Sequence, residues 1–435
     1  MRDADTIVAL SSGGLPAGVA IIRLSGHLVP KILSEVVGKL PSPRNLEYQK
    51  FKAGSEIIDQ GLVAFFPAPF SFTGEDCAEL HAHGSVAVVR ALLNYLSSLD
   101  GVRLADPGEF TRRAFENGKM DLVEVEGLSD LIIAETENQR EIALSRMSGG
   151  LTHHIESWRQ QLLALRAEIE ARLDFSDEGD VAEQLPRSFQ KQLRALDEEF
   201  RTALKEASGG RIIREGFRVA LAGLPNAGKS SLINALVDSD LAIVSTEAGT
   251  TRDVREVPLD IDGQLVIFVD MAGLTDTDSI AEAEGVRRAR QEIAQADFVL
   301  WLLAPDQELA SGYLEQDADY LVVGSKSDLG DHHVKVDLRI STIEKTGLDA
   351  LMDRVKNALD KSISNKHSAL LCRVRDQEAI STARERLKVA IEHLNEPEIA
   401  ADALRQSSDA LARLLGKLDP EHILGEIFSS FCIGK

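Results

Sequence analysis

The chain has 435 residues, 27% of them charged and 44% hydrophobic, which predicts two or three folded domains. Its net charge of −22 excludes a protein that coats nucleic acid nonspecifically, so any RNA contact needs a local basic patch or a basic partner. It has no 18-residue apolar run and no secretory signal at its start, so we expect a cytoplasmic chain without a membrane span. The three cysteines, Cys77, Cys372 and Cys432, are widely spaced, which suits a reducing compartment and excludes a disulfide framework or a zinc site.

The pattern of apolar residues changes along the chain. Residues 1–118 carry short β-like runs broken by glycine and proline, at Thr6–Leu10, Gly18–Leu24 and Ile57–Phe66. Residues 119–213 are patterned as helix, and helical periodicity returns within residues 366–435. The apolar stripe of the first helical arm is formed by Leu151, Ile155, Trp158, Leu162, Leu165, Ile169 and Leu173. Because one such arm rarely buries its stripe alone, we expect the two arms to form one helical domain with residues 214–365 inserted between them.

The segment 223–230 reads Gly-Leu-Pro-Asn-Ala-Gly-Lys-Ser and lies between an apolar run, Phe217–Leu221, and a helix-patterned segment. Strand, glycine-rich loop and helix in this order predict a phosphate-binding loop. Its glycines let backbone N–H groups surround phosphate oxygens. We expect Lys229 to reach the β- and γ-phosphates and Ser230 to bind Mg²⁺. The predicted nucleotide contacts here are Asn226, Ala227, Gly228, Lys229, Ser230 and Ser231.

Three later motifs narrow the nucleotide to GTP. Thr251 lies in a loop that can close over Mg²⁺ and the γ-phosphate, and Asp270–Gly273 fits the Asp-x-x-Gly motif that senses this phosphate. Asp328 is expected to accept two hydrogen bonds from the guanine edge, which adenine cannot supply. The predicted contacts here are Thr251, Asp270, Met271, Ala272, Gly273, Ser325, Lys326, Asp328, Ser341 and Thr342, and the predicted Mg²⁺ ligands are Ser230, Thr251 and Asp270.

Two positions depart from the usual GTPase pattern. Ser325 stands where an asparagine is usual, so we expect one hydrogen bond to guanine or to the phosphate loop to be lost, at a cost of up to about tenfold in affinity. Leu274 stands where Ras-like proteins carry the glutamine that orients the attacking water. Either hydrolysis is very slow or another residue takes this role. Glu282 is the candidate, and the alternative is a solvated helix carboxylate.

Five stretches carry a resemblance that covers the whole chain. They are Asp5–Ala9, Gly18–Gly26, Ser71–Gly84, Pro107–Leu122 and the terminal Phe431–Lys435. With these segments the chain resembles the MnmE (TrmE) family of tRNA-modification GTPases. Taken alone, the terminal Cys-Ile-Gly-Lys would suggest a prenylation signal, but a final lysine argues against that.

The resemblance implies a multidomain α/β and α fold. An N-terminal α+β domain, residues 1–118, would dimerise and bind a tetrahydrofolate through Arg23, Glu79, Lys119 and Lys435. A helical domain would be built from residues 119–213 and 366–435, with a Ras-like P-loop GTPase domain, residues 214–365, inserted. Cys432 would either act in carbon transfer or merely pack.

The resemblance also implies how GTP is hydrolysed. Glu282 falls where the family carries its general acid/base, and K⁺ would replace an arginine finger, although Arg252 remains a secondary candidate for that finger. The ion would be bound by the Asn226 side chain and by a loop in which Ser245, Glu247 and Thr250 are ligands. The residues of this loop, which would also contact GTP, are Ser245, Thr246, Glu247, Ala248, Gly249 and Thr250.

Together these expectations describe a Mg²⁺-dependent, K⁺-stimulated GTPase that acts on tRNA as a homodimer. With an FAD-dependent partner of the MnmG type, in a heterotetramer, it would form carboxymethylaminomethyl or aminomethyl groups at carbon 5 of the wobble uridine. The carbon would come from 5-formyl- or methylene-tetrahydrofolate, and the nitrogen from glycine or ammonium. Two alternatives remain open: a ribosome-assembly GTPase with an RNA-binding appendage, and a folate-dependent methyl-transfer enzyme with a regulatory GTPase insert. Neither DNA nor a membrane is an expected partner.

Overall fold

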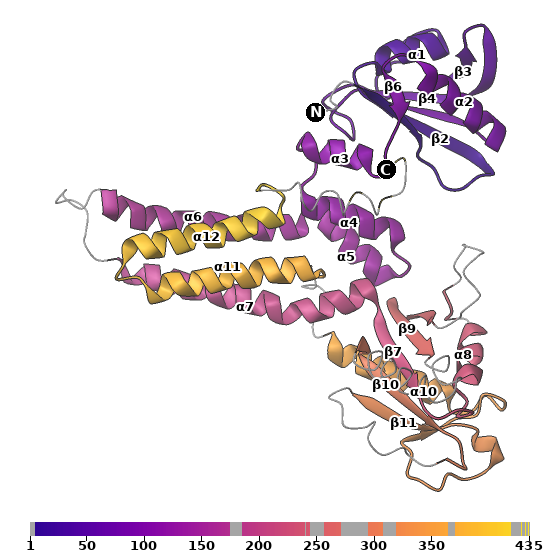
Figure 1. Ribbon diagram of the computed structural model, residues 1–435, viewed down its shortest axis with the longest axis vertical. Coiled ribbons are helices and arrows are strands. Elements are labelled where there is room, and N and C mark those ends of the chain that lie inside the picture. Colours follow the sequence, from indigo (N-terminus) through magenta and orange to yellow (C-terminus); the bar gives the residue numbers. More distant parts are fainter. Residues whose placement is uncertain are drawn as a thin grey trace, which may run out of the picture. The chain divides into compact units, whose positions relative to one another are not determined.

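The computed structural model of the chain describes residues 5–174, 185–239, 241–243, 256–270, 295–307, 319–363 and 370–418, with the single residues 428, 431 and 434. The chain divides into two compact units (Figure 1). The first unit comprises Met1–Ser129 and Ala412–Lys435, and the second comprises Asp130–Leu411. Within the described residues, no helix is both long and apolar enough to span a membrane.

The first unit is built on a six-stranded sheet with the order β3-β4-β5-β2-β1-β6. Only β1 and β6 pair in parallel among its described strands. One hydrophobic core joins the sheet to α1 and α2, with Leu24 and Leu80 packed among the helix residues Leu33 and Leu92. The three β-like runs predicted from the sequence are strands. The elements are β1 (Thr6–Leu10), β2 (Ala17–Ser25), α1 (Val29–Val37), β3 (Glu47–Ala53), β4 (Glu56–Phe66), β5 (Cys77–Gly84), α2 (Val86–Ser98), β6 (Val102–Leu104) and α3 (Glu109–Glu116).

Long helices form one part of the second unit. They are α4 (Leu122–Ile133, which begins in the first unit), α5 (Glu137–Met147), α6 (Gly150–Asp174), α7 (Arg187–Glu215), α11 (Val374–Glu392) and α12 (Pro397–Leu414, which ends in the first unit). The predicted apolar stripe lies on α6, where six of its seven residues are buried and Leu173 is half-buried. Helices α7 and α11 lie side by side (Figure 1), and Arg384 bridges to Asp197 between them at 2.8 Å. Segments on either side of the inserted residues therefore pack together.

The second sheet has the order β12-β11-β10-β7-β9-β8. Strand β7 runs parallel to β9 and β10, and among the strands that the structure describes in this sheet only β8 is antiparallel to its neighbour. Parallel strands end at one edge, and ligands of such sheets bind outside their carboxyl ends. Asp270 ends β9, and Gly324 ends β11, at this edge. The elements are β7 (Phe217–Ala222), α8 (Lys229–Val237), β8 (Glu256–Ile261), β9 (Gln264–Asp270), β10 (Phe298–Leu303), β11 (Tyr320–Gly324), the 3-10 turn η2 (Ser327–Leu329), β12 (Leu338–Arg339) and α10 (Leu348–Ser362).

Candidate functional site

The predicted phosphate loop joins β7 to α8, as the sequence motif requires. Gly223 has φ +142°, and a Cβ at this position would lie 2.4 Å from the carbonyl oxygen of Leu302. Gly228 has φ +91° and precedes the first residue of α8, and Asn226 between them is also left-handed, with φ +63°. Glycine is therefore required at both ends of the loop for steric reasons. A side chain at Gly223 would clash with the backbone of Leu302, and one at Gly228 would strain the left-handed backbone. The loop presents the start of α8, where backbone N–H groups lack helical partners and favour anions.

Lys229 is folded into the phosphate loop. Its Nζ donates hydrogen bonds to the carbonyl oxygens of Gly223, at 2.8 Å, and Leu224, at 3.0 Å. Burial lowers the pKa of Lys229 from its ordinary value, and the charge of Asp270 acts in the opposite direction. The ammonium group is thus held at the loop by two carbonyl oxygens, and a phosphate oxygen can replace these contacts.

Two of the predicted Mg²⁺ ligands meet at the end of β9. Ser230, in the first turn of α8, donates a hydrogen bond from Oγ to Oδ2 of Asp270 at 3.3 Å. A hydroxyl and a carboxylate are the hard oxygen donors that Mg²⁺ prefers, and Mg²⁺ commonly takes only one or two protein ligands beside phosphate and water. The donor set at this position therefore fits the predicted ion.

Ser325 keeps a contact to the phosphate loop. Its hydroxyl donates to the carbonyl oxygen of Ala227 at 2.6 Å, and lies 3.1 Å from that of Leu303. The side chain is only 4% exposed. The sequence suggested that one bond to guanine or to the phosphate loop is lost when serine replaces asparagine. The bond to the loop is present, because the short side chain sits directly beside the backbone of Ala227.

The predicted base-recognition residues follow β11. Asp328 lies in η2, and its Oδ1 accepts a hydrogen bond from Ser341 Oγ at 2.6 Å. Ser341 is fully buried, and Thr342 beside it is half-buried. The loop also holds Lys326 in a left-handed conformation with φ +53°. Ser341 therefore orients the carboxylate of Asp328, whereas its predicted contact with the nucleotide stays a prediction.

Several sequence-predicted residues lie outside the part of the chain that the structure describes. They are Ser245, Thr246, Glu247, Ala248, Gly249, Thr250, Thr251, Arg252, Met271, Ala272, Gly273, Glu282, Cys432 and Lys435. Their assignments stay predictions. Asn226, Ala227, Gly228, Lys229, Ser230, Ser231, Asp270, Ser325, Lys326, Asp328, Ser341 and Thr342 are described, and all lie on the segments that end at one edge of the second sheet.

A second group of predicted residues lies in the first unit. Arg23 on β2 is directly opposite Glu79 on β5 in the strand register. Its Nε and Nη2 donate to Oε1 of Glu79 at 3.1 and 2.9 Å. The guanidinium also lies over two aromatic rings, 5.5 Å from the centroid of Phe72 and 5.9 Å from that of Phe110. Sequence reasoning missed both rings, although each lies inside a stretch that carried the resemblance.

Lys119 and the chain terminus belong to the same unit. Lys119 is exposed, and its Cε would lie 3.1 Å from a Cβ added to Gly74. Near the terminus, the carbonyl oxygen of Gly434 accepts a hydrogen bond from Ser11 Oγ at 2.7 Å. A Cβ at Gly434, whose φ is +96°, would lie 2.1 Å from the carbonyl oxygen of Leu10. Gly434 therefore lies against the end of β1, at a position that admits no side chain.

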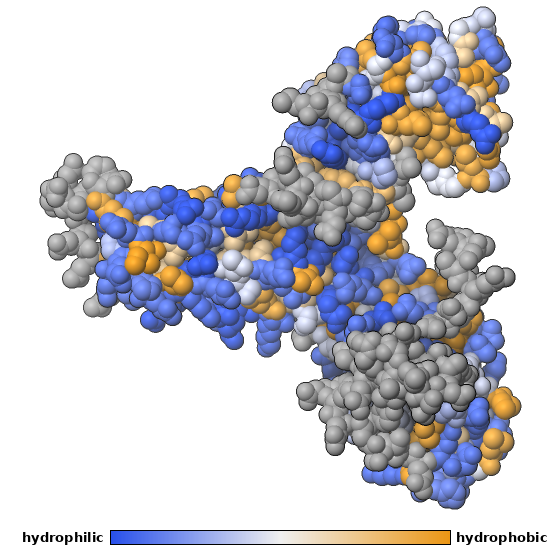
Figure 2. Space-filling model, in the orientation of Figure 1, coloured by the Kyte–Doolittle hydropathy of each residue, from blue (hydrophilic) through white to orange (hydrophobic). Residues whose placement is uncertain are grey.

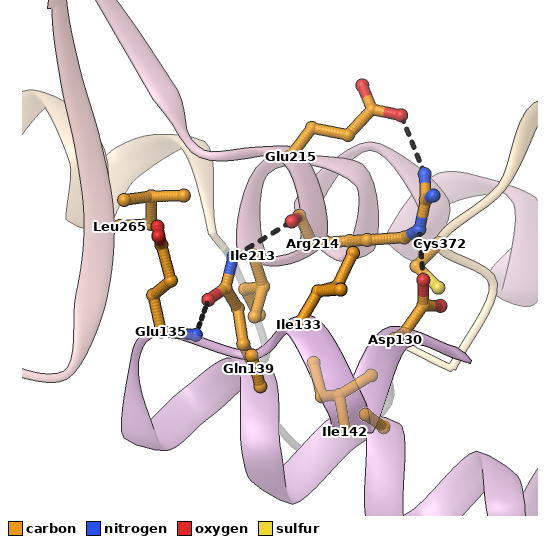
Figure 3. A pocket seen from close by; sticks show the side chains of 12 residues that line it. Asp130, Ile133, Glu135, Gln139, Ile142, Ile213, Arg214, Glu215, Leu265 and Cys372 are labelled. Carbon is orange, nitrogen blue, oxygen red and sulfur yellow. Dashed lines mark hydrogen bonds and ion pairs between the residues drawn. The ribbon is translucent and has the colours of Figure 1, made fainter. Parts of the chain in front are cut away.

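A pocket of about 440 Å³ lies where the helices of the second unit meet its sheet (Figure 3). Arg214, in the last turn of α7, bonds Asp130 through Nε at 3.1 Å, and Gln139 donates to the carbonyl oxygen of Arg214 at 3.0 Å. Cys372 also lines the pocket, and burial raises the pKa of its thiol to about 11. These contacts anchor the end of α7 just before the chain enters β7, so they support the second sheet without forming part of the candidate nucleotide site.

Two family models match the chain. The one described as "MnmE helical domain" matches residues 122–432, and the one described as "GTP-binding protein TrmE N-terminus" matches residues 6–119. Among curated relatives, the tRNA modification GTPase MnmE of Rhizobium johnstonii is 46% identical over 434 residues, covering 99% of both chains. The protein of that name from Brucella anthropi is 45% identical over 434 residues, covering 99% of this chain and 98% of the relative.

Two solved structures match about a third of the chain each. The G-domain of FeoB from Methanococcus jannaschii is 24% identical and covers 33% of this chain and 98% of its own, with a TM-score of 0.26. Era from Aquifex aeolicus, solved with GDP and aluminium fluoride, is 25% identical and covers 33% of this chain and 56% of its own, also with a TM-score of 0.26. The family assignment rests instead on the family models and on full-length relatives. On that ground, the chain belongs to the MnmE (TrmE) family of tRNA-modification GTPases.

Proposed function

We propose that this chain binds and hydrolyses GTP as part of tRNA modification. The observation that carries the proposal is the convergence, at one edge of the second sheet, of Lys229, the Ser230–Asp270 pair and the Ser341–Asp328 pair. These are the three chemical elements that a guanine nucleotide needs: a cation for phosphate, oxygen ligands for Mg²⁺ and an oriented carboxylate for the base. Full-length likeness to relatives named tRNA modification GTPase supports tRNA as the substrate.

In the proposed site, Lys229 exchanges its carbonyl contacts for β- and γ-phosphate oxygens. Ser230 and Asp270 hold Mg²⁺, together with Thr251. The ion would offset the negative charge that the triphosphate carries during cleavage. Asp328, oriented by Ser341, accepts hydrogen bonds from the guanine edge. This division of roles follows from the chemistry of each group: a point cation for phosphate, hard oxygens for the ion and a carboxylate for two N–H donors.

Hydrolysis would depend on Glu282 as the general acid/base, with K⁺ near the phosphates. The Asn226 side chain would contribute one ligand, and it is exposed on the phosphate loop, where a bound ion could reach it. Ser245, Glu247 and Thr250 would contribute the rest. Arg252 is kept as the alternative source of positive charge. These roles rest on the family resemblance.

Carbon transfer would take place in the first unit, on a tetrahydrofolate. Arg23, Glu79 and Phe72 support this proposal by their geometry, because a paired arginine and glutamate beside an exposed aromatic ring offer both hydrogen bonds and flat apolar surface to a pterin. Phe110 is fully buried, so its ring packs against the guanidinium of Arg23 and offers no surface to a ligand. The other groups proposed to bind the folate are Lys119 and Lys435. The folate would supply the one-carbon unit, these residues would bind and orient it, and Cys432 would either act in the carbon transfer or pack.

We propose a homodimer formed through the first unit, with an FAD-dependent MnmG-type protein as the second partner. Figure 2 shows hydrophobic surface gathered on the first unit, over the region of β2 and β4. Exposed apolar residues of these strands include Val19, which is 55% exposed, and Ile57, which is 50% exposed. A contiguous apolar surface is typical of an interaction site. Because the net charge of this chain is −22, a basic partner would help to bring tRNA to it.

Two measurements test the proposal. Hydrolysis of GTP by the full chain is expected to be faster in KCl than in NaCl at equal ionic strength, and Glu282→Ala is expected to lower turnover about 10²–10⁴-fold without weakening GTP binding. Equal rates in the two salts would contradict the K⁺ site, and full activity of the variant would contradict the role of Glu282.

The tRNA role is tested by mass spectrometry of tRNA from cells that lack this chain. The modified wobble uridine is expected to disappear and to return on complementation. A wobble uridine that is still modified in the deletion strain would contradict the proposed tRNA role, but it would not contradict the proposed GTP hydrolysis. Ribosome-assembly defects with normal tRNA would favour the ribosome-assembly GTPase instead.

A further inference from the structure

His332 lies under the loop that is expected to read the base, and no sequence motif includes it. The imidazole is 9% exposed. Its Nε2 lies 3.0 Å from the carbonyl oxygen of Leu303 and 3.0 Å from that of Ser325. Because carbonyl oxygens only accept hydrogen bonds, Nε2 must carry the proton and donate to both. Among the described residues, Nδ1 is buried without a hydrogen-bond partner, so the polar contact of the ring with this loop is made by Nε2.

The two carbonyl groups that His332 binds come from neighbouring strands. Leu303 is the last residue of β10, and Ser325 follows directly on β11. The N–H of Ser325 also donates to the carbonyl oxygen of Leu303 at 2.8 Å. From Ser325 the contacts continue to the phosphate loop, because the hydroxyl bonds Ala227 at 2.6 Å. One imidazole therefore binds the ends of β10 and β11 together. The loop expected to read the base follows β11, and Ser325 in that loop also makes the hydrogen bond to the phosphate loop.

Gly324 makes room for this ring. A Cβ added to Gly324 would lie 2.8 Å from Cε1 and 2.9 Å from Nε2 of His332. Such distances are shorter than any normal carbon contact, so an alanine would displace the imidazole from the two carbonyl groups. Gly324 and His332 thus fit together sterically, since the ring occupies the space that a side chain at position 324 would fill. Between them in the sequence, the short side chain of Ser325 is long enough to bond the phosphate loop.

We propose that His332 is a positioning residue of the nucleotide site. Its Nε2–H holds the backbone at Leu303 and Ser325, and so sets the placement of Lys326 and Asp328 relative to the phosphate loop. The inference rests on the proposed GTP site. It predicts that His332 contributes to the affinity for GTP and GDP equally, since both carry the same base, and contributes nothing to the chemical step.

The test compares three variants of the full chain with the unmodified protein. His332→Leu removes the donor, His332→Gln keeps an N–H donor at similar reach, and His333→Leu alters an exposed neighbour as the matched control. The dissociation constants for GTP and GDP are measured by fluorescent-nucleotide titration, and turnover by steady-state kinetics.

His332→Leu is expected to weaken binding of both nucleotides about three- to tenfold, the equivalent of one net hydrogen bond, and to raise KM while kcat is unchanged. His332→Gln is expected to restore most of the affinity, and His333→Leu to leave it unchanged. Gly324→Ala should reproduce the effect of His332→Leu with the histidine still present. The role of the donor would be overturned if a folded His332→Leu protein bound both nucleotides as tightly as the unmodified chain. It would also be overturned if His332→Gln bound them as weakly as His332→Leu.

Two outcomes separate this inference from the function on which it rests. An unmodified chain that binds neither nucleotide overturns the proposed GTP site, and this inference with it, whereas tight binding that is indifferent to His332 overturns only the inference. If His332→Leu does not fold, nitrogen NMR of the histidine-labelled full chain decides the matter. The His332 signal is expected to be that of the Nε2–H tautomer, and an Nδ1–H tautomer would exclude the two proposed hydrogen bonds.

Discussion

The ion pair between Arg146 on α5 and Asp376 at the start of α11 offers a direct test of how the helical segments are held together. The two side chains are fully buried, and Nη1 of Arg146 lies 2.7 Å from Oδ2 of Asp376. The same nitrogen donates to the carbonyl oxygen of Leu370. Removing one partner of such a pair leaves a buried charge without its counter-charge, which costs about 3–5 kcal/mol. We therefore expect Asp376→Ala to lower the stability of the helical part by about this amount.

The assay uses the two tryptophans of the chain. Trp158 lies on α6 against Phe200 of α7, at 5.0 Å between ring centroids, whereas Trp301 lies on β10 of the second sheet. In a Trp301→Phe background, fluorescence follows the unfolding of the helices alone. With an m-value of about 3 kcal/mol per molar urea, Asp376→Ala is expected to shift the urea midpoint down by roughly 1–2 M.

The control pair has the same nitrogen–oxygen distance but lies within one helix and is exposed. Arg405 and Asp402 on α12 are also 2.7 Å apart, with side chains about half exposed, so Asp402→Ala is expected to change the midpoint little. The double change Arg146→Met with Asp376→Leu should recover most of the lost stability, because it removes both charges together. If Asp376→Ala shifts the midpoint no more than Asp402→Ala does, burial of the pair has no energetic consequence and the reasoning is refuted.

Three further outcomes are expected. Asp328→Asn should shift the preference of the chain from GTP towards xanthosine triphosphate, because an amide donates where the carboxylate accepted; an unchanged preference in nucleotide titrations would mean that the base is read elsewhere. Cys432→Ser should abolish wobble-uridine modification in a complemented deletion strain while GTP hydrolysis stays intact; full modification would leave Cys432 as a packing residue. Cys372, whose pKa is raised to about 11 by burial, should react with iodoacetamide at pH 8 about a hundredfold more slowly in the folded chain than a free thiol, and equal rates by mass spectrometry would contradict its burial.

The amino-acid sequence by itself determined the local parts of the nucleotide site. The phosphate loop lies between β7 and α8 as predicted, because its glycines, Lys229 and Ser230 act within one short turn whose conformation depends on neighbouring residues. The apolar stripe of α6 was also predicted from the sequence, since helical periodicity depends only on the spacing of residues along one segment. Asp328 and Ser341 were both predicted as nucleotide contacts, but the hydrogen bond between them was not.

Tertiary structure alone decided the contacts between distant segments. Ser325 reaches Ala227, 98 residues away, because β7 and β11 flank β10 and end at the same edge. Glu79 meets Arg23 through the register of β2 and β5, in which a shift by one residue would turn one of the two side chains to the opposite face. His332 belongs to no motif, and its role depends on the space left above Gly324. Such contacts depend on strand order, register and available volume, and these are set by the packing of the whole sheet.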